Sequence, residues 1–97
     1  MIVAVARLTL VLPDNNSLKG KRKVVRSLIE KVRHRFAAAI AEVEDHDKWQ
    51  RAKIGVALVG NDARLLQTRL DQIMQYMENQ HLAEIIGSQV ELCYLES

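Results

Sequence analysis

The sequence contains very little cysteine and proline. Its single cysteine, Cys93, excludes an intrachain disulfide framework and a cysteine-rich zinc site. The single proline and a hydrophobic fraction of 48% argue against disorder and for one regular globular domain over residues 1–97. A chain without a disulfide framework suits a reducing compartment. We therefore expect a cytoplasmic protein.

Long apolar runs are also lacking. The most apolar segment, residues 1–12, contains Arg7 and leads into the turn residues 13–16. A spanning helix needs about 20 apolar residues, and a signal peptide needs a basic start and a small-residue cleavage site. We expect this segment to be a buried strand, and the protein to have no membrane partner.

No catalytic constellation is visible. The chain has no Walker loop, no dinucleotide-binding glycine motif, no nucleophile elbow and no paired acid and base. The acidic run Glu42–Asp47, which includes His46, offers hard metal ligands, but its spacing matches no metal-loop motif. A run of this kind more commonly forms a charged hairpin. We expect a non-enzymatic protein with no cofactor and no metal site.

The hydrophobic periodicity predicts the element order β-α-β-β-α-β. Strands are expected at Ile2–Leu12, Ala38–Val43, Arg51–Val59 and Gln89–Leu95, and helices at Ser17–Arg35 and 63–79, capped by Ser17 and Asp62. Residues 82–86 fit either the end of the second helix or the last strand. This order is that of the ferredoxin-like α+β fold, a four-stranded antiparallel sheet with two helices on one face. The first and third strands are central in that fold, and they are the most apolar strands here.

Most of the positive charge gathers in the first expected helix. Ser17–Arg35 holds eight Lys/Arg and one acid, a net charge of +7, whereas the whole chain carries +2 and the remainder therefore −5. At about 100° per residue, five cations fall on one stripe about 100° wide beside the apolar face. They are Lys19, Arg22, Lys23, Arg26 and Arg33.

The start of this helix carries cations where acids are normally found. Lys19, Lys21, Arg22 and Lys23 lie in the first two turns, although the helix dipole favours acids near that end by about 0.3–1 kcal/mol each. Gly20 would leave a bare backbone through which an anion could approach free N–H groups. An anionic partner would complete this arrangement.

We predict that the basic helix binds the phosphate backbone of RNA. The predicted contacts are Lys19, Lys21, Arg22, Lys23, Arg26 and Arg33, with Gln50 and Arg51 as further surface contacts. The alternative is a solvated helix face whose cations pair with Asp14, Glu42 or Glu44. Trp49 could stack on a base or anchor a partner, but we expect it to close one end of the core.

The expected sheet leaves one face uncovered. Its central strands contain no aromatic residue, which argues against base stacking of the RRM type. The first strand places Val3, Val5, Thr9 and Val11 on this face around Arg7. Because an exposed apolar face is adhesive, we expect a homo-oligomer formed through this face or an edge strand. The alternative function is therefore a homo-oligomeric ligand-sensing or scaffolding protein that uses the open face.

A family resemblance rests on two blocks of sequence. They are Pro13…Ser17-Leu18-Lys19-Gly20-Lys21-Arg22 and Ala41-Glu42-Val43…Asp47-Lys48-Trp49-Gln50-Arg51-Ala52…Ile54-Gly55-Val56-Ala57. Together they resemble the YlxP-like family of small bacterial proteins. The resemblance implies a ferredoxin-like fold and a domain of unknown function. The family's genes commonly lie among those for translation initiation and ribosome maturation, which implies rRNA or a ribosomal subunit as the partner. The family offers no active site to transfer.

Overall fold

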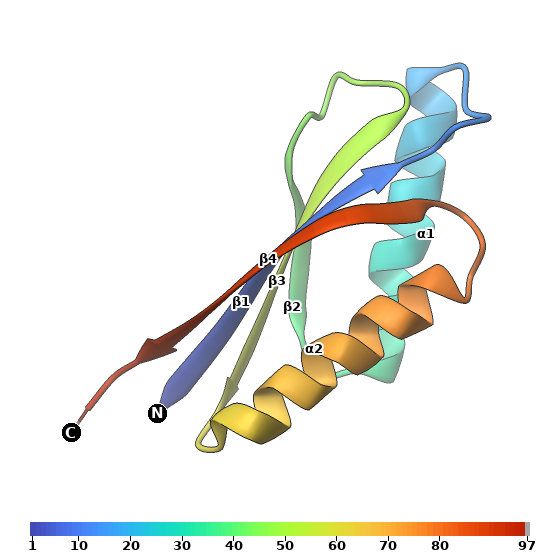
Figure 1. The fold of residues 1–97 in the computed structure, drawn as a ribbon. Coiled ribbons are helices and arrows are strands. Elements are labelled where there is room, and N and C mark those ends of the chain that lie inside the picture. Colours follow the sequence, from blue (N-terminus) through green and yellow to red (C-terminus); the bar gives the residue numbers. More distant parts are fainter. Residues whose placement is uncertain (97) are drawn as a thin grey trace.

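The computed structural model describes residues 1–96. Its elements are β1 (Ile2–Val11), α1 (Leu18–Arg35), β2 (Ala39–Glu44), β3 (Arg51–Gly60), α2 (Ala63–Glu78) and β4 (Glu84–Tyr94). The strands form one antiparallel sheet in the order β2-β3-β1-β4, and both helices lie against one face of it (Figure 1). The predicted ferredoxin-like α+β fold, with the first and third strands in the centre, is confirmed.

The core lies between the sheet and the helices. Alternate residues of β1 and β3 are buried there, since successive side chains of a strand point to opposite faces. The helix α2 contributes four residues spaced three or four apart, Leu66, Leu70, Ile73 and Met77, each at most 2% exposed. From α1 come Val25, Leu28 and Val32. The open face of the sheet has no such cover.

Both helices begin at the predicted caps. Ser17 Oγ accepts a hydrogen bond of 3.0 Å from the Gly20 N–H, and Asp62 Oδ1 accepts one of 3.2 Å from the Leu65 N–H. Each bond satisfies a donor that the first helical turn leaves free. Within residues 1–96, no helix combines the length and the apolar character that crossing a membrane requires.

The last strand starts earlier than predicted. β4 begins at Glu84 rather than Gln89, so residues 84–86 belong to the strand and not to the end of α2. The strand contains a bulge next to Gly87, opposite Thr9 and Leu10 of β1. At its start, Glu78 Oε1 accepts a 2.9 Å hydrogen bond from the Ile85 N–H. A bulge takes up one extra residue and hides the strand's period from sequence inspection.

Candidate nucleic-acid interface on the first helix

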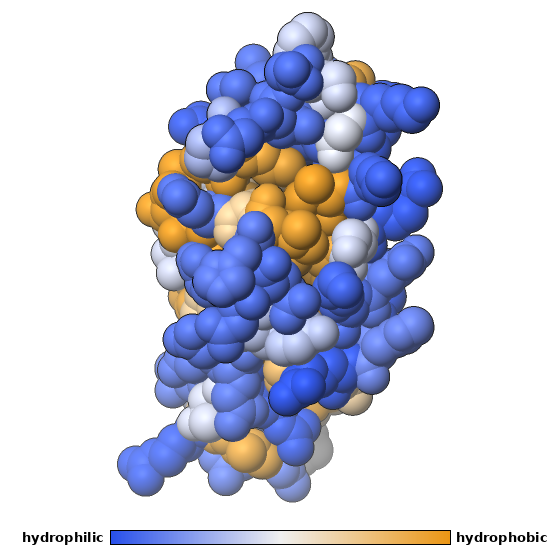
Figure 2. All heavy atoms as spheres, turned by 90° about the vertical axis from the view of Figure 1, so that its right-hand side faces the viewer, coloured by the Kyte–Doolittle hydropathy of each residue, from blue (hydrophilic) through white to orange (hydrophobic). Residues whose placement is uncertain are grey.

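Seven cations of α1 are exposed and have no ion-pair partner within residues 1–96, and four of them lie close together on one stripe. Lys19, Arg22, Lys23 and Arg26, named here the basic stripe, are all exposed. The ion pairs within residues 1–96, Arg7–Glu44 and Lys21–Glu42, involve none of them. The first turn of α1 contains no acid either. The positive charge of the stripe is therefore uncompensated within the described chain. Figure 2 shows the side on which α1 lies, largely hydrophilic around a central apolar area.

Arg33 continues the stripe toward the end of α1. It is exposed, and its Nη2 donates a 2.9 Å hydrogen bond to the carbonyl oxygen of Ile40 in β2. This contact places the Arg33 guanidinium beside the β2 edge of the sheet. A guanidinium has five N–H donors, so the others stay free for a ligand.

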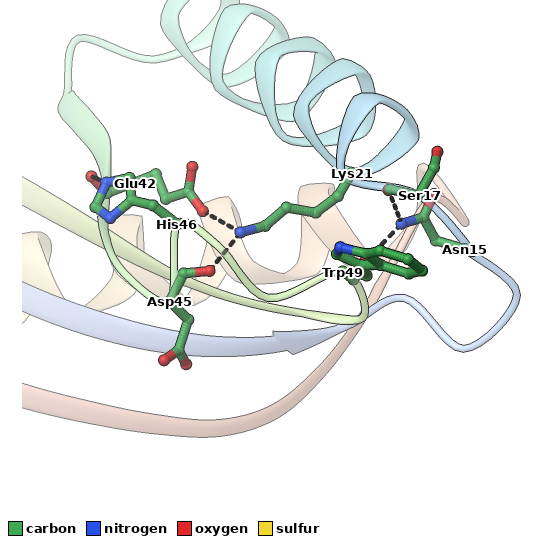
Figure 3. Close-up of polar contacts among 7 residues, drawn as sticks. All are labelled: Asn15, Ser17, Lys21, Glu42, Asp45, His46 and Trp49. Carbon is green, nitrogen blue, oxygen red and sulfur yellow. Dashed lines mark hydrogen bonds and ion pairs between the residues drawn. The ribbon is translucent and has the colours of Figure 1, made fainter.

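Lys21 is not part of the anion-binding surface, and its prediction as a contact is wrong. Its side chain is 0% exposed, its Nζ lies 2.6 Å from Glu42 Oε2, and it donates a 2.6 Å bond to the carbonyl oxygen of Asp45 (Figure 3). On the helical wheel Lys21 lies at about 300°, between Leu28 and Val32 on the core side. The alternative interpretation, pairing with the protein's own carboxylate, holds for this lysine.

The expected approach of an anion at Gly20 is also wrong. The Gly20 N–H already donates to Ser17 Oγ, and a Cβ at this position would collide with Asn15 Oδ1. The missing side chain makes room for the chain's own asparagine. Glycine at this position therefore serves the packing of the β1–α1 loop rather than a ligand.

Asn15 and Gln50 join this loop to the β2–β3 hairpin. Asn15 Nδ2 donates to the carbonyl oxygens of Ser17 and Trp49, at 2.6 and 2.5 Å (Figure 3). Gln50 Nε2 donates to the carbonyl oxygen of Asn15 at 2.9 Å, with a longer contact to that of Pro13 at 3.4 Å. The predicted contact Gln50 is exposed, but its amide is engaged with the backbone. Several residues of the two family-like blocks thus brace one end of the fold.

Trp49 does not close the core, contrary to expectation. Its side chain is 55% exposed, while its carbonyl oxygen is held by Asn15 at the start of α1 (Figure 3). The backbone is fixed by the hairpin network, and more than half of the side chain faces solvent. The sequence analysis assigned Trp49 a structural role, whereas the structure places an exposed indole near the N-terminal end of α1.

Arg51 lies apart from the basic stripe. It is exposed and pairs in register with Val11, while its neighbour Ala52 is fully buried on the helix side. Because side chains alternate along a strand, Arg51 belongs to the open face of the sheet. The structure therefore does not join it to the α1 contacts.

The open face is more polar than β1 alone indicated. Arg7 Nη1 lies 2.7 Å from Glu44 Oε1 of β2, and its Nε donates a 3.0 Å bond to Gln89 Oε1 of β4. This polar bridge spans the sheet in the middle of the face. Exposed apolar side chains remain at Val43 (45%) and Val59 (64%). Within residues 1–96, no three His, Cys, Asp or Glu side chains come together as a metal-ligand set.

Comparison with known proteins identifies the family and the fold. The chain is 26% identical over 78 residues to the uncharacterized protein YlxP of Bacillus subtilis (strain 168), covering 80% of this chain and 85% of that protein. The solved structure of the de novo designed protein Foldit4 is similar in fold, with a TM-score of 0.54, 10% identity and coverage of 99% of this chain and 100% of the designed chain. The family model described as protein of unknown function (DUF503) matches residues 3–90, and the chain belongs to that family.

Proposed function

We propose that this protein is a non-enzymatic RNA-binding protein that holds phosphate groups with the basic stripe of α1, with rRNA or a ribosomal subunit as its partner. The observation that carries the proposal is the uncompensated charge of Lys19, Arg22, Lys23 and Arg26 on one exposed stripe. Lys21, on the core side of the helix, has a carboxylate partner in Glu42. The cations of the stripe have no such partner within residues 1–96.

The shape of the stripe favours a polymer over a small anion. Lys19 and Arg26 are 7 residues apart, which is about 10 Å along an α-helix, and Arg33 extends this line to about 21 Å. A nucleic-acid backbone repeats its negative charge over such a length, and phosphate contacts of this kind tolerate many sequences. The exposed Trp49 ring at the N-terminal end of α1 offers one surface on which an unpaired base can stack. Together these features support binding of single-stranded or loop RNA.

Binding to RNA is expected to weaken steeply with salt. Four phosphate contacts on a single strand give a slope of the logarithm of the association constant against that of salt near about −3. The association constant should then fall about 50-fold between about 50 and 200 mM salt. Anisotropy of a labelled single-stranded RNA measures this. Quenching of Trp49, the single tryptophan, reports base stacking in the same titration.

The matched ligand is a flexible polyanion without bases, such as polyphosphate of similar length. If the protein binds RNA but not polyphosphate, and Trp49 is quenched, the proposal is supported in full. If it binds both ligands equally and Trp49 is not quenched, recognition is restricted to phosphate. A protein that binds neither ligand at about 50 mM salt, where phosphate contacts are strongest, would contradict the proposal.

Lys19→Glu is expected to change stability and binding in opposite directions. Lys19 lies in the first turn of α1, which holds no acid, so a carboxylate there interacts favourably with the helix dipole. The free energy of unfolding should rise by about 0.5–1 kcal/mol, or roughly 2–8 °C in Tm. RNA affinity should fall at the same time, because one phosphate contact becomes a repulsion. Thermal melting and RNA anisotropy on the same preparation test both effects.

Lys31→Glu is the control for this variant, because Lys31 is exposed on the same helix but outside the basic stripe. It changes the net charge equally and should leave RNA affinity close to that of the wild type. Should Lys19→Glu bind RNA as well as Lys31→Glu does, the first turn of α1 has no part in RNA binding.

A further inference from the structure

The two edges of the sheet differ in how they are protected. β2 has 6 residues, a register irregularity between Glu42 and Glu44, and a carbonyl at Ile40 that accepts a bond from Arg33. β4 has 11 residues, and its segment Gly87–Tyr94 pairs regularly with β1 on one side only. An edge strand with free main-chain groups is a template for another strand. The unprotected edge is therefore that of β4.

The regular segment of β4, Gly87–Tyr94, carries few of the devices that normally block edge pairing: the bulge lies before it, and its one charged residue is Glu91. It contains neither lysine, arginine nor proline. The N–H of Ile85 is occupied by Glu78, but within residues 1–96 no side chain donates to or accepts from the main chain of residues 86–94. Figure 1 shows the C-terminal half of β4 running away from both helices at the edge of the sheet.

Three apolar side chains line this edge at intervals of four residues. Ile86 is 55% exposed, Val90 46% and Tyr94 63%. Val90 and Tyr94 pair with Ala6 and Ile2, which are buried on the helix side, so both belong to that face of the sheet. Neither helix covers them. Such residues would normally be core residues of a central strand.

We propose that two copies of this chain pair antiparallel through β4, which joins their sheets into one of eight strands. The register that places Val90 against Val90 of the second copy sets Ser88 opposite Leu92 on the helix side, and it brings Ile86, at the bulge, level with Tyr94. On the open face it sets Gln89 opposite Glu91. Directly opposed side chains of this kind are the contacts that stabilise a sheet.

The polar contacts favour the same register. Gln89 Oε1 accepts bonds from Arg7, and within residues 1–96 the Gln89 amide N–H groups and the Glu91 carboxylate have no partner. The amide can therefore donate to Glu91 of the second copy. A shift by one pair in one direction places Glu91 against Glu91, and a shift in the other places Val90 against Ser88. Like charges directly opposite each other destabilise a pair of strands, so the first shift is disfavoured.

Lysine at position 90 should separate the two copies. Val90→Lys places two ammonium groups against each other at the centre of the contact. Sedimentation velocity should show a wild-type dimer at about 100 µM, consistent with an interface at the small end of the range, and a Val90→Lys monomer at the same concentration. Val59→Lys is the matched control, because Val59 is 64% exposed on the open face. It should remain a dimer.

Cross-linking tests the register without destabilising the interface. Opposed residues in an antiparallel pair have Cα atoms about 4.5–5.5 Å apart, which a disulfide can span. With Cys93 replaced by serine, Val90→Cys should form a covalent dimer on mild oxidation, and Gln89→Cys should form little. A wild-type monomer at about 100 µM, or dissociation by Val59→Lys but not by Val90→Lys, would overturn the proposal. Circular dichroism and melting confirm that each variant is folded.

Discussion

Replacing Lys21 with alanine is expected to lower the free energy of unfolding by about 3–5 kcal/mol. The Lys21 side chain is 0% exposed and that of Glu42 15%, and their charged groups lie 2.6 Å apart. Removing the ammonium leaves the buried Glu42 carboxylate without its counter-charge, and Glu42 Oε2 has no hydrogen-bond partner of good geometry within residues 1–96. Domains of this size have a total stability of about 5–15 kcal/mol, so the variant should be marginal.

Thermal melting measures this loss as a fall in Tm of at least about 12 °C. Lys19→Ala is the control, because Lys19 is exposed two residues away on the same helix. It should change stability by less than about 0.5 kcal/mol. A Lys21→Ala protein as stable as Lys19→Ala would show that the ion pair contributes nothing to the fold.

The double variant Lys21→Met/Glu42→Leu separates loss of the pair from loss of its partner. Replacing a buried ion pair by apolar residues of similar volume is often neutral or stabilising, whereas breaking it is costly. The double variant should therefore recover most of the stability lost in Lys21→Ala. The recovery should be incomplete, because the carbonyl oxygen of Asp45 also loses its 2.6 Å donor.

The fold could be predicted from the sequence because its signals are local and periodic. The caps at Ser17 and Asp62, the three- and four-residue spacing on α2 and the dense apolar runs of β1 and β3 are each local signals. The start of β4 could not be predicted, because a bulge breaks the period there. A register irregularity depends on the partner strand and leaves no pattern in one strand alone.

The candidate site was predicted in part. The angular position of Lys21, in the middle of the apolar face of α1, was a sufficient sign that its ammonium points toward the sheet. Nothing in the sequence indicated that Glu42 and the Asp45 carbonyl would meet it, since both come from the β2–β3 hairpin. The exposure of Trp49 likewise depends on how the hairpin is placed against the β1–α1 loop.

The polar residues around α1 divide into two groups in space. Asn15, Lys21, Glu42 and Gln50 face one another and brace the loop, helix and hairpin. The basic stripe faces away from this network. A variant of the stripe should therefore change what the protein binds without changing its fold. A variant of the network should lower the stability of the fold without changing the binding surface. This separation lets one test distinguish the two roles.

The triple variant Arg22→Glu/Lys23→Glu/Arg26→Glu is expected to raise the Kd for single-stranded RNA more than 100-fold at low salt. Three phosphate contacts of about 1 kcal/mol each amount to about 3 kcal/mol, and a tenfold change in Kd corresponds to about 1.4 kcal/mol. The magnitude of the salt slope should fall from about 3 to less than about 1, because only Lys19 remains of the stripe. All three residues are exposed and outside the ion pairs, so the melting temperature should not fall.

The control must carry the same total charge. Lys31→Glu/Arg64→Glu/Arg69→Glu also reverses three exposed cations, so both triple variants have a net charge of −4 where the wild type has +2. None of these three residues lies on the stripe. If net charge alone attracted RNA, both variants would lose affinity equally. Loss confined to the first variant locates binding on α1, and equal loss in both would show that α1 has no special role.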